Sequence, residues 1–528
     1  MSGEDMRPMA ATAANLGSPT DPGSLEAWLK HLPADTGAAF ASLRDQAKGF
    51  VTSPVQPHQR FVMLERMHAH ALQLMPEQRN RYLGKPVPLE GAERQAWEVC
   101  VGLWEAFYFA YALCTESGAD SNHTAAVWQR ALACLGRAIR ECGFAYHTAP
   151  SGLWKELNSC FRTAEGCLLD EVAVADVDPA APTIDCRRTY LAIVLHDAAN
   201  TYALSPQQML ALEQLLPAWS AAVTLTSEHP ADVSHSPLAI DLARDTGAQL
   251  ARALQGADTL RFLDMAQIAA RLRDLAAAVR GGTLPLELAA TRSLSRSTTE
   301  RLLTHLYVQW CSAGSGRTEE RRDSTRRAQM ALNMHAIHFQ ISGRAFRQPG
   351  LRYTREEEHD LATFGHITER TEQRLLTAES SALEPWEIIN QSASGVQSMM
   401  RKPDLESRIH HGQLIALRAS TMEPPALAAV QRIRIDNDGA LIIGVRMVRG
   451  APRGAAVRSA HDTTAKYERA LIVDADAERD APAYLILPPN RFAAGETIEL
   501  HTGRAEKVTI TSVLEKNIDH DRATYKPA

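Results

Sequence analysis

The sequence predicts a multidomain α + β protein, in which an all-α N-terminal region precedes an antiparallel β-barrel and a further small β region. Three observations support this fold class. The 528 residues suffice for roughly three domains of ~100–200 residues each. Apolar residues recur at helical spacing through residues 23–311. From about Ala328, short alternating segments bounded by turn residues replace that pattern.

Composition and charge exclude several classes of protein. With 45% hydrophobic and 22% charged residues, the chain has the composition of an ordinary globular protein. No apolar run approaches the ~18–20 residues of a membrane span, and Met1–Thr20 lacks the apolar core of a secretory signal. We therefore expect a cytoplasmic protein without membrane insertion. The net charge is −6, whereas proteins that bind DNA or RNA usually carry clustered positive charge. We therefore expect neither DNA nor RNA as a partner.

The N-terminal region divides into helical segments separated by breakers. The clearest helix is predicted over Thr259–Gly281, because apolar residues from Leu260 to Val279 recur at nearly every third or fourth position. Similar patterns predict helices over Gly91–Leu113, Ala125–Cys142, Arg188–Tyr202 and Ser205–Thr224. We therefore expect a flexible N-terminus over residues 1–22 and one or more all-helical domains over residues 23–311.

Strand patterns fill the C-terminal part of the chain. The strongest is a hairpin over Ala429–Val448, in which apolar alternation on both sides flanks the turn Asn437–Gly439. Many short strands with turns indicate a small barrel or sandwich over residues 328–455, interrupted by a charged helical insertion at 354–377, with an additional β region and tail at 456–528. The other strand candidates are Met330–Ile341, Trp386–Asn390, Val396–Met400, Gln413–Arg418, Ala470–Val473, Tyr484–Leu487, Thr497–Leu500 and Val508–Leu514.

No sequence pattern predicts catalysis. The chain lacks a G-x-S-x-G serine, the zinc motif H-E-x-x-H and the glycine-rich phosphate loops. On the predicted strand, His335 and His338 would face opposite sides and could not share a metal. The eight cysteines contain no C-x-x-C pair. We therefore predict no catalytic residue, no metal site and no cofactor, and a protein that is not an enzyme.

Two polar motifs lie at the start of the predicted barrel. Residues 312–327 form an arginine-rich linker that contains two R-x-x-x-R pairs, Arg317/Arg321 and Arg322/Arg326. Between two later strand candidates lies the pattern N-x-S-x-x-G, formed by Asn390, Ser392 and Gly395. Either motif alone is common, so the prediction depends on their order and on the strands around them.

In this order and context, the two motifs resemble the PilZ domain, a six-stranded β-barrel that binds the bacterial second messenger cyclic di-GMP. The resemblance covers about residues 317–450 and implies a PilZ-like antiparallel β-barrel over 328–455. More loosely, the whole chain is similar to long proteobacterial proteins with a helical N-terminal region. The resemblance implies cyclic di-GMP as ligand, bound by Arg322, Arg326, Asn390, Ser392 and Gly395, with Arg321 and Arg327 as near neighbours.

The residue types suit this ligand on chemical grounds. Guanine presents O6 and N7 as paired acceptors that match the fork of an arginine, and arginine–phosphate hydrogen bonds are strengthened by charge. Asn390 offers an amide and Ser392 a hydroxyl for a guanine edge or a phosphate. Gly395 permits a positive φ and a close approach of the backbone.

The predicted function is a cyclic di-GMP receptor and effector. Ligand binding would order the linker at residues 312–327 and reorient the helical domain, which would bind a protein partner and regulate motility, pili or biofilm-type outputs. Two alternatives stay open. One is a nucleotide-independent interaction scaffold with a degenerate barrel, and the other is an enzyme with an unrecognised site in the helical half.

Overall fold

The structure is a computed structural model with two compact units, Met1–Thr318 and Glu319–Ala528. It describes residues 17–528 except 116–119, 179–180, 229, 231–236, 255, 257, 313–321, 351–354, 367, 369–382, 393–394, 402–406, 420–423, 463 and 476–481. Side chains at 322–326, 356, 391–392, 395–398 and 419 are likewise outside the description. Most of the segment predicted to be a flexible N-terminus, residues 1–22, falls outside the described residues.

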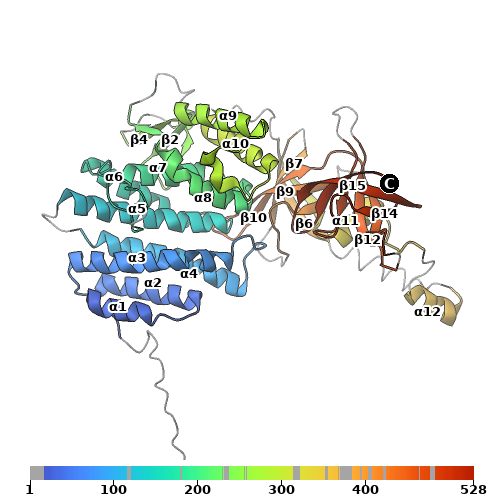
Figure 1. Ribbon diagram of the computed structural model, residues 1–528, viewed down its shortest axis with the longest axis horizontal. Coiled ribbons are helices and arrows are strands. Elements are labelled where there is room, and N and C mark those ends of the chain that lie inside the picture. The colour runs from blue at the N-terminus through green and yellow to red at the C-terminus, as the bar shows by residue number, and fades with distance from the viewer. Residues whose placement is uncertain are drawn as a thin grey trace, which may run out of the picture. The chain divides into compact units, whose positions relative to one another are not determined.

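The first unit is built mainly of helices, as Figure 1 shows. Most of them begin at a residue whose side chain accepts a hydrogen bond from the first turn, which satisfies a backbone donor that has no partner within the helix; these caps are Asp21, Asp35, Asp120, Asp185, Ser205 and Ser295. The helices are α1 (Pro22–Lys30), α2 (Thr36–Thr52), α3 (Pro57–Asn80), α4 (Gly91–Ala112), α5 (Ser121–Phe144), α6 (Leu153–Gly166), α7 (Cys186–Ala198), α8 (Pro206–Ser220), α9 (Ala266–Arg280) and α10 (Arg296–Cys311).

This unit also contains a small antiparallel sheet, so the all-α prediction was incomplete. Its strands lie in the order β1 (Thr224–Thr226), β4 (Leu260–Asp264), β2 (Leu238–Asp241) and β3 (Gln249–Leu250). The helix predicted from Thr259 therefore begins only at Ala266. Leu260 and Phe262, which are two positions apart in β4, are both buried against β2 and the segment after β3. Because β4 has only five residues, its alternation of buried and less buried side chains could not be distinguished in the sequence from the start of a helix.

A glycine sets the close packing of α5 against α7. A Cβ atom at Gly136 would overlap with the Cγ1 and Cδ1 atoms of Ile193, a side chain that is itself buried. We expect Gly136→Ala to destabilise the helical unit by ~1–3 kcal/mol, because extra volume in a filled core forces side chains out of their rotamers. Urea unfolding followed by circular dichroism measures this change.

Two further variants separate this clash from the intrinsic effect of alanine in a helix. In an Ile193→Ala background, Gly136→Ala is expected to cost much less, because the clashing atoms are gone. Gly49→Ala in α2 is the matched control, since its Cβ would meet no atom within 4 Å. A Gly136→Ala variant as stable as the wild type would show that α5 and α7 do not pack as described.

The second unit begins with a closed antiparallel barrel of six strands, which confirms the predicted architecture. The hairpin of β9 and β10 follows the prediction, and its turn includes Gly439 at φ 83°. Around the barrel the strands run β10 (Leu441–Met447), β7 (Gly395–Arg401), β6 (Leu383–Ser392), β5 (Arg322–Ala331), β8 (Leu414–Ala419) and β9 (Ala426–Ile435).

Two predictions near the start of this barrel were wrong. The strand predicted at Met330–Ile341 is the end of β5 followed by helix α11 (Met334–Ser342), because Asn333 caps a helix whose buried Ile337 packs between strands. The linker predicted to extend to residue 327 ends earlier, because β5 pairs with β6 from Arg322 onward. In the charged insertion, α12 covers Arg355–Phe364, and residues 367 and 369–377 lie outside the described range.

The additional β region is a second closed six-stranded antiparallel barrel. Figure 1 shows it in the darkest reds at the C-terminal end of the chain. Alternate residues of each strand fill its interior, including Val457, Leu485 and Ile510. Its strands run β11 (Pro452–Ser459), β12 (Glu468–Val473), β13 (Tyr484–Leu487), β16 (Asp521–Pro527), β15 (Ala505–Lys516) and β14 (Thr497–His501).

Candidate ligand-binding site

The pairing of β5 with β6 brings the two polar motifs together. Arg326 and Asn390 are 64 positions apart in the sequence. In the sheet, the backbone of Arg322 pairs with Gln391 and that of Asp323 with Asn390. Paired residues in an antiparallel sheet have Cα atoms about 4.5–5.5 Å apart. The arginine motif and the first half of N-x-S-x-x-G therefore lie on neighbouring strands at one end of the barrel.

Irregular pairing marks the same place. Between Asp323 and Arg326, β5 advances three residues while β6 advances two, so β5 bulges between the two arginines. The register of β6 against β7 also shifts on both sides of Asn390. Such bulges bend a strand and re-aim its side chains, and they are frequent beside binding sites. The motif thus coincides with the most irregular part of the β5–β6–β7 pairing.

The second half of the N-x-S-x-x-G motif forms the end of a hairpin. Ser392 is the last residue of β6, Gly395 is the first residue of β7, and the two pair directly. The intervening residues 393–394 are outside the described range. Because the hairpin end lies next to Arg322 across β5 and β6, all three residues of this motif share one end of the barrel with the arginines.

Asn390 provides a buried acceptor at this end of the barrel. Its side chain is half-buried, and its Oδ1 atom has no hydrogen-bond partner among the described residues. A buried polar atom without a partner costs about 1–3 kcal/mol. A donor that reached Oδ1 would recover this cost, so the site favours a ligand that offers N–H groups.

The remaining predicted site residues are described to different extents. Arg327 is exposed, and its backbone pairs with Glu387 one step beyond the bulge. Arg321 lies outside the described residues. Arg322, Arg326 and Ser392 are placed by their backbone, and their side chains are not described. The convergence of the motifs therefore rests on strand register rather than on side-chain contacts.

One buried cation in this barrel was not anticipated. Arg401, at the far end of β7 from Gly395, is 2% exposed, and its guanidinium lies 5.6 Å from the ring centroid of Trp386. It donates to Oε2 of Glu384 at 3.3 Å. No sequence signal distinguishes it from a surface arginine at a strand end. These contacts give it a structural role in closing the opposite end of the barrel.

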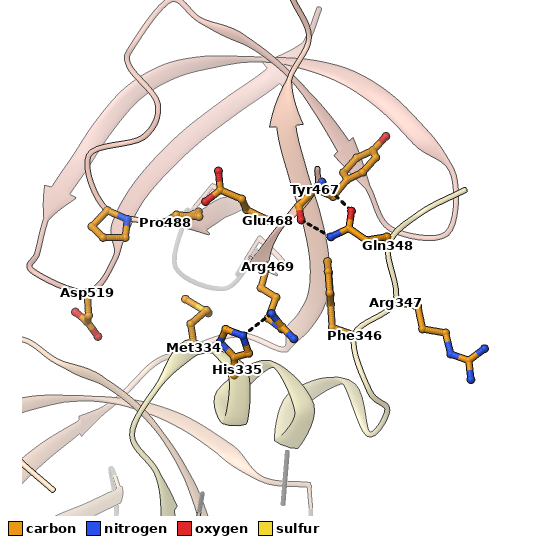
Figure 2. A pocket seen from close by; sticks show the side chains of 11 residues that line it. Met334, His335, Phe346, Arg347, Gln348, Tyr467, Glu468, Arg469, Pro488 and Asp519 are labelled. Atoms are coloured by element: carbon orange, nitrogen blue, oxygen red, sulfur yellow. Dashed lines mark hydrogen bonds between the residues drawn. The ribbon is translucent and has the colours of Figure 1, made fainter. Parts of the chain in front are cut away.

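A cavity in this unit lies elsewhere, beside the second barrel. It encloses about 490 Å³ between α11, the segment Phe346–Gln348 and the start of β12. The side-chain amide of Gln348 exchanges two hydrogen bonds of 2.9 Å with the backbone of Tyr467, and Nη1 of Arg469 lies 2.8 Å from Nε2 of His335 (Figure 2). Gln348, His335 and Arg469 thus already have hydrogen-bond partners, and no residue of the two motifs lines this cavity. We therefore place the candidate site at the end of β5 and β6.

The described residues contain neither a metal centre nor a helix that could span a membrane. Over those residues, no group of three or more histidine, cysteine, aspartate or glutamate side chains could hold a metal ion. His335 and His338 lie on helix α11 rather than on the predicted strand, and Nε2 of His338 is 3.3 Å from the Ala455 carbonyl. In the same part of the chain, no helix is long and apolar enough to cross a bilayer.

Comparisons with known proteins agree with this architecture. The family model described as the N-terminal domain of the cyclic-di-GMP receptor FimW matches residues 23–231, and that of the FimW C-terminal beta-barrel domain matches 454–528. The candidate site lies between these matches. The chain is 23% identical to the cyclic-di-GMP receptor FimW of Pseudomonas aeruginosa, over 92% of this chain and 87% of that protein. No solved structure matches.

The second match coincides with a domain seen in the structure, because it spans the second barrel from β11 to β16. The first match covers α1 to α8 of the helical unit. The family is described as a receptor. This description agrees with the prediction that the protein is not an enzyme. Since both end domains of one family occur in order and together span more than half of the sequence, the chain belongs to the FimW family.

Proposed function

We propose that the chain is a receptor and effector for cyclic di-GMP, and that the first barrel binds the dinucleotide between β5 and the hairpin of β6 and β7. One observation supports this proposal: β5 pairs with β6 so that Arg322 lies opposite Gln391, which stands between Asn390 and Ser392, and Arg326 lies opposite Ile388, two positions before Asn390. The relative's printed description as a cyclic-di-GMP receptor supports the choice of ligand. A cytoplasmic location is part of the proposal.

The chemistry of the dinucleotide fits the groups at this end of the barrel. Two phosphates and two guanine edges supply acceptors for the forks of Arg322 and Arg326. The N1 and N2 donors of a guanine can reach an amide oxygen, and Asn390 presents one that lacks a partner among the described residues. The ligand would therefore satisfy both the cationic and the acceptor groups of the site.

The place of the site in the chain suggests how binding is relayed. The second unit begins at Glu319, and β5 begins three residues later at Arg322. A ligand held at Arg322 would restrain the chain where it passes from the helical unit into the barrel. We propose that this restraint changes which protein partner the helical unit binds, with motility, pili or biofilm-type processes as the output.

Calorimetric titration of the full chain with cyclic di-GMP tests the proposal. We expect saturable binding of cyclic di-GMP and much weaker binding of cyclic di-AMP, because adenine presents an N6 donor where guanine presents the O6 acceptor. Absence of binding, or equal binding of the two dinucleotides, would contradict it. Partner capture that ignores the nucleotide would instead favour the interaction scaffold.

Asn390→Ala is expected to weaken cyclic di-GMP binding about 5- to 30-fold, which corresponds to ~1–2 kcal/mol for a hydrogen bond to a buried acceptor. Asn437→Ala is the matched control, because Asn437 lies in the exposed β9–β10 turn at the opposite end of the same barrel. Both dissociation constants are measured by calorimetry. An Asn390→Ala variant with the affinity of the Asn437→Ala variant would remove Asn390 from the site.

A further inference from the structure

The helical unit contains a cavity that the proposed nucleotide site does not use. It encloses about 240 Å³ between the C-terminal ends of α5 and α7, the start of α6 and the loop at residues 245–247. Its walls combine aromatic side chains, hydroxyl groups and carboxylates. The volume lies below the ~300–1,000 Å³ typical of pockets for drug-sized ligands, so its occupant must be small.

The lining of this cavity is electronegative. Asp197 and Asp245 both line it, and the described residues of its lining include no lysine or arginine. The carboxylate of Asp245 accepts hydrogen bonds from the backbone N–H groups of Gly152 at 2.6 Å and Lys155 at 2.9 Å, so it caps the first turn of α6. The carboxylate of Asp197 has no hydrogen bond or ion pair among the described residues. The carboxylate of Asp245 thus stabilises the start of α6, whereas that of Asp197 has no such structural role among the described residues.

Two features make a charge on Asp197 costly without a partner. Asp197 is the penultimate residue of α7, where the partial negative charge of the helix end opposes a carboxylate. Burial raises the pKa of Asp197 to about 6. The neighbouring His196 cannot compensate, because burial and the nearby Arg140 lower its pKa to about 3 and keep it neutral at physiological pH. A bound cation would relieve this cost.

His196 supplies a second observation that points to a ligand. This residue also lines the cavity, is only 2% exposed, and its Nε2 atom has no hydrogen-bond partner among the described residues. The aromatic rings of Trp154 and Tyr202 form further parts of the wall. An indole or phenol ring beside a carboxylate attracts organic cations, because the ring face carries negative potential.

A glycine keeps this arrangement open. A Cβ atom at Gly247 would overlap with Oδ2 of Asp197 and with the indole ring of Trp154. Any other residue at this position would push the carboxylate and the indole apart. The loop at residues 245–247 thus closes the cavity while leaving Asp197 in place.

We propose that the helical unit binds a compact organic cation of the alkylammonium or alkylguanidinium class in this cavity, with Asp197 as its counter-ion. The carboxylate neutralises the cation, the rings of Trp154 and Tyr202 contact its apolar part, and the hydroxyl of Thr201 lies in the same wall for its N–H groups. This inference concerns the helical unit alone and does not depend on cyclic di-GMP binding.

Titration of the full chain with methylguanidinium and methylammonium chloride at pH 8 tests this proposal, with sodium chloride at equal ionic strength as the salt control. We expect saturable binding of at least one cation by calorimetry and a matching rise in the melting temperature of the helical unit. Binding of that cation should weaken at least tenfold between pH 8 and pH 5, because Asp197 is protonated below its pKa. Failure of both cations to bind saturably at pH 8 would overturn the proposal.

Two variants and a control assign the effect to Asp197. Asp197→Asn should lose at least tenfold in affinity and also raise the melting temperature of the ligand-free protein at pH 8, since it removes a buried charge. Gly247→Ala keeps the carboxylate and should weaken binding by crowding it. Asp274→Asn, on the exposed face of α9, should change neither quantity. Wild-type affinity in Asp197→Asn or in Gly247→Ala would refute the assignment.

Discussion

Replacing Arg322 and Arg326 together by alanine is expected to reduce the affinity for cyclic di-GMP by a factor of about 10²–10⁴. A hydrogen bond to a charged group contributes about 1.5–3 kcal/mol, and the double variant removes at least two such interactions with phosphates or guanine edges. The backbone of β5 pairs with β6 whatever the side chain, so the barrel should still fold. Calorimetry on the full chain measures the loss.

The double variant needs a control for the general loss of positive charge. Arg504 is suitable, because its side chain is 85% exposed in a turn of the second barrel and contacts only Glu506 among the described residues. Arg504→Ala should bind cyclic di-GMP with wild-type affinity. An unchanged dissociation constant in the Arg322→Ala/Arg326→Ala variant would exclude both arginines and leave Arg321 and Arg327 as the next candidates.

Glu141→Ala is expected to destabilise the helical unit by about 3–5 kcal/mol. Glu141 is 1% exposed and accepts hydrogen bonds at 2.5 Å from both Arg79 and the hydroxyl of Tyr82. Glu213 bonds the other side of Arg79 at 2.8 Å. Breaking a buried pair leaves one charge without compensation, which is among the most costly single changes in a protein. Urea unfolding, followed at a helix-sensitive wavelength, measures this loss.

A surface ion pair in the same unit provides the comparison. Arg280 and Glu300 lie 2.7 Å apart, with side chains 67% and 32% exposed. Exposed pairs of this kind contribute at most about 1 kcal/mol, because water and salt screen them. Glu300→Ala should therefore change stability little. If Glu141→Ala were no more destabilising than Glu300→Ala, the network around Arg79 would not hold α3, α5 and α8 together.

Local sequence patterns identified strands of the first barrel, and the resemblance to the PilZ domain identified the barrel, but neither gave the details that build its site. The β9–β10 hairpin could be predicted, because the turn at Asn437–Gly439 separates two alternating segments. The N-x-S-x-x-G motif could be assigned to a strand end for the same reason. The bulge between Asp323 and Arg326 could not, because it depends on pairing with a strand some 60 residues away in the sequence.

Helix α11 and the small sheet of the helical unit show the complementary limit. Met330–Ile341 carries apolar residues that fit a strand or a short helix, and only the cap at Asn333 and the packing of Ile337 decide between them. The Asp197 cavity has no sequence signal at all, since its walls come from three helix ends and a loop. Sequence patterns therefore predict structures formed by residues that are close in the chain, and they miss those that depend on contacts between distant segments.

The position of α11 has a consequence for how the C-terminal half folds. Ala336 and Ile337 share one apolar cluster with Leu414 and Leu427 of the first barrel and with residues of the second, Leu471 and Ile486. A cut at residue 454, where the C-terminal family match begins, would expose this cluster to water on both fragments. The two barrels should consequently melt in a single cooperative transition, and either one produced alone would be prone to aggregate.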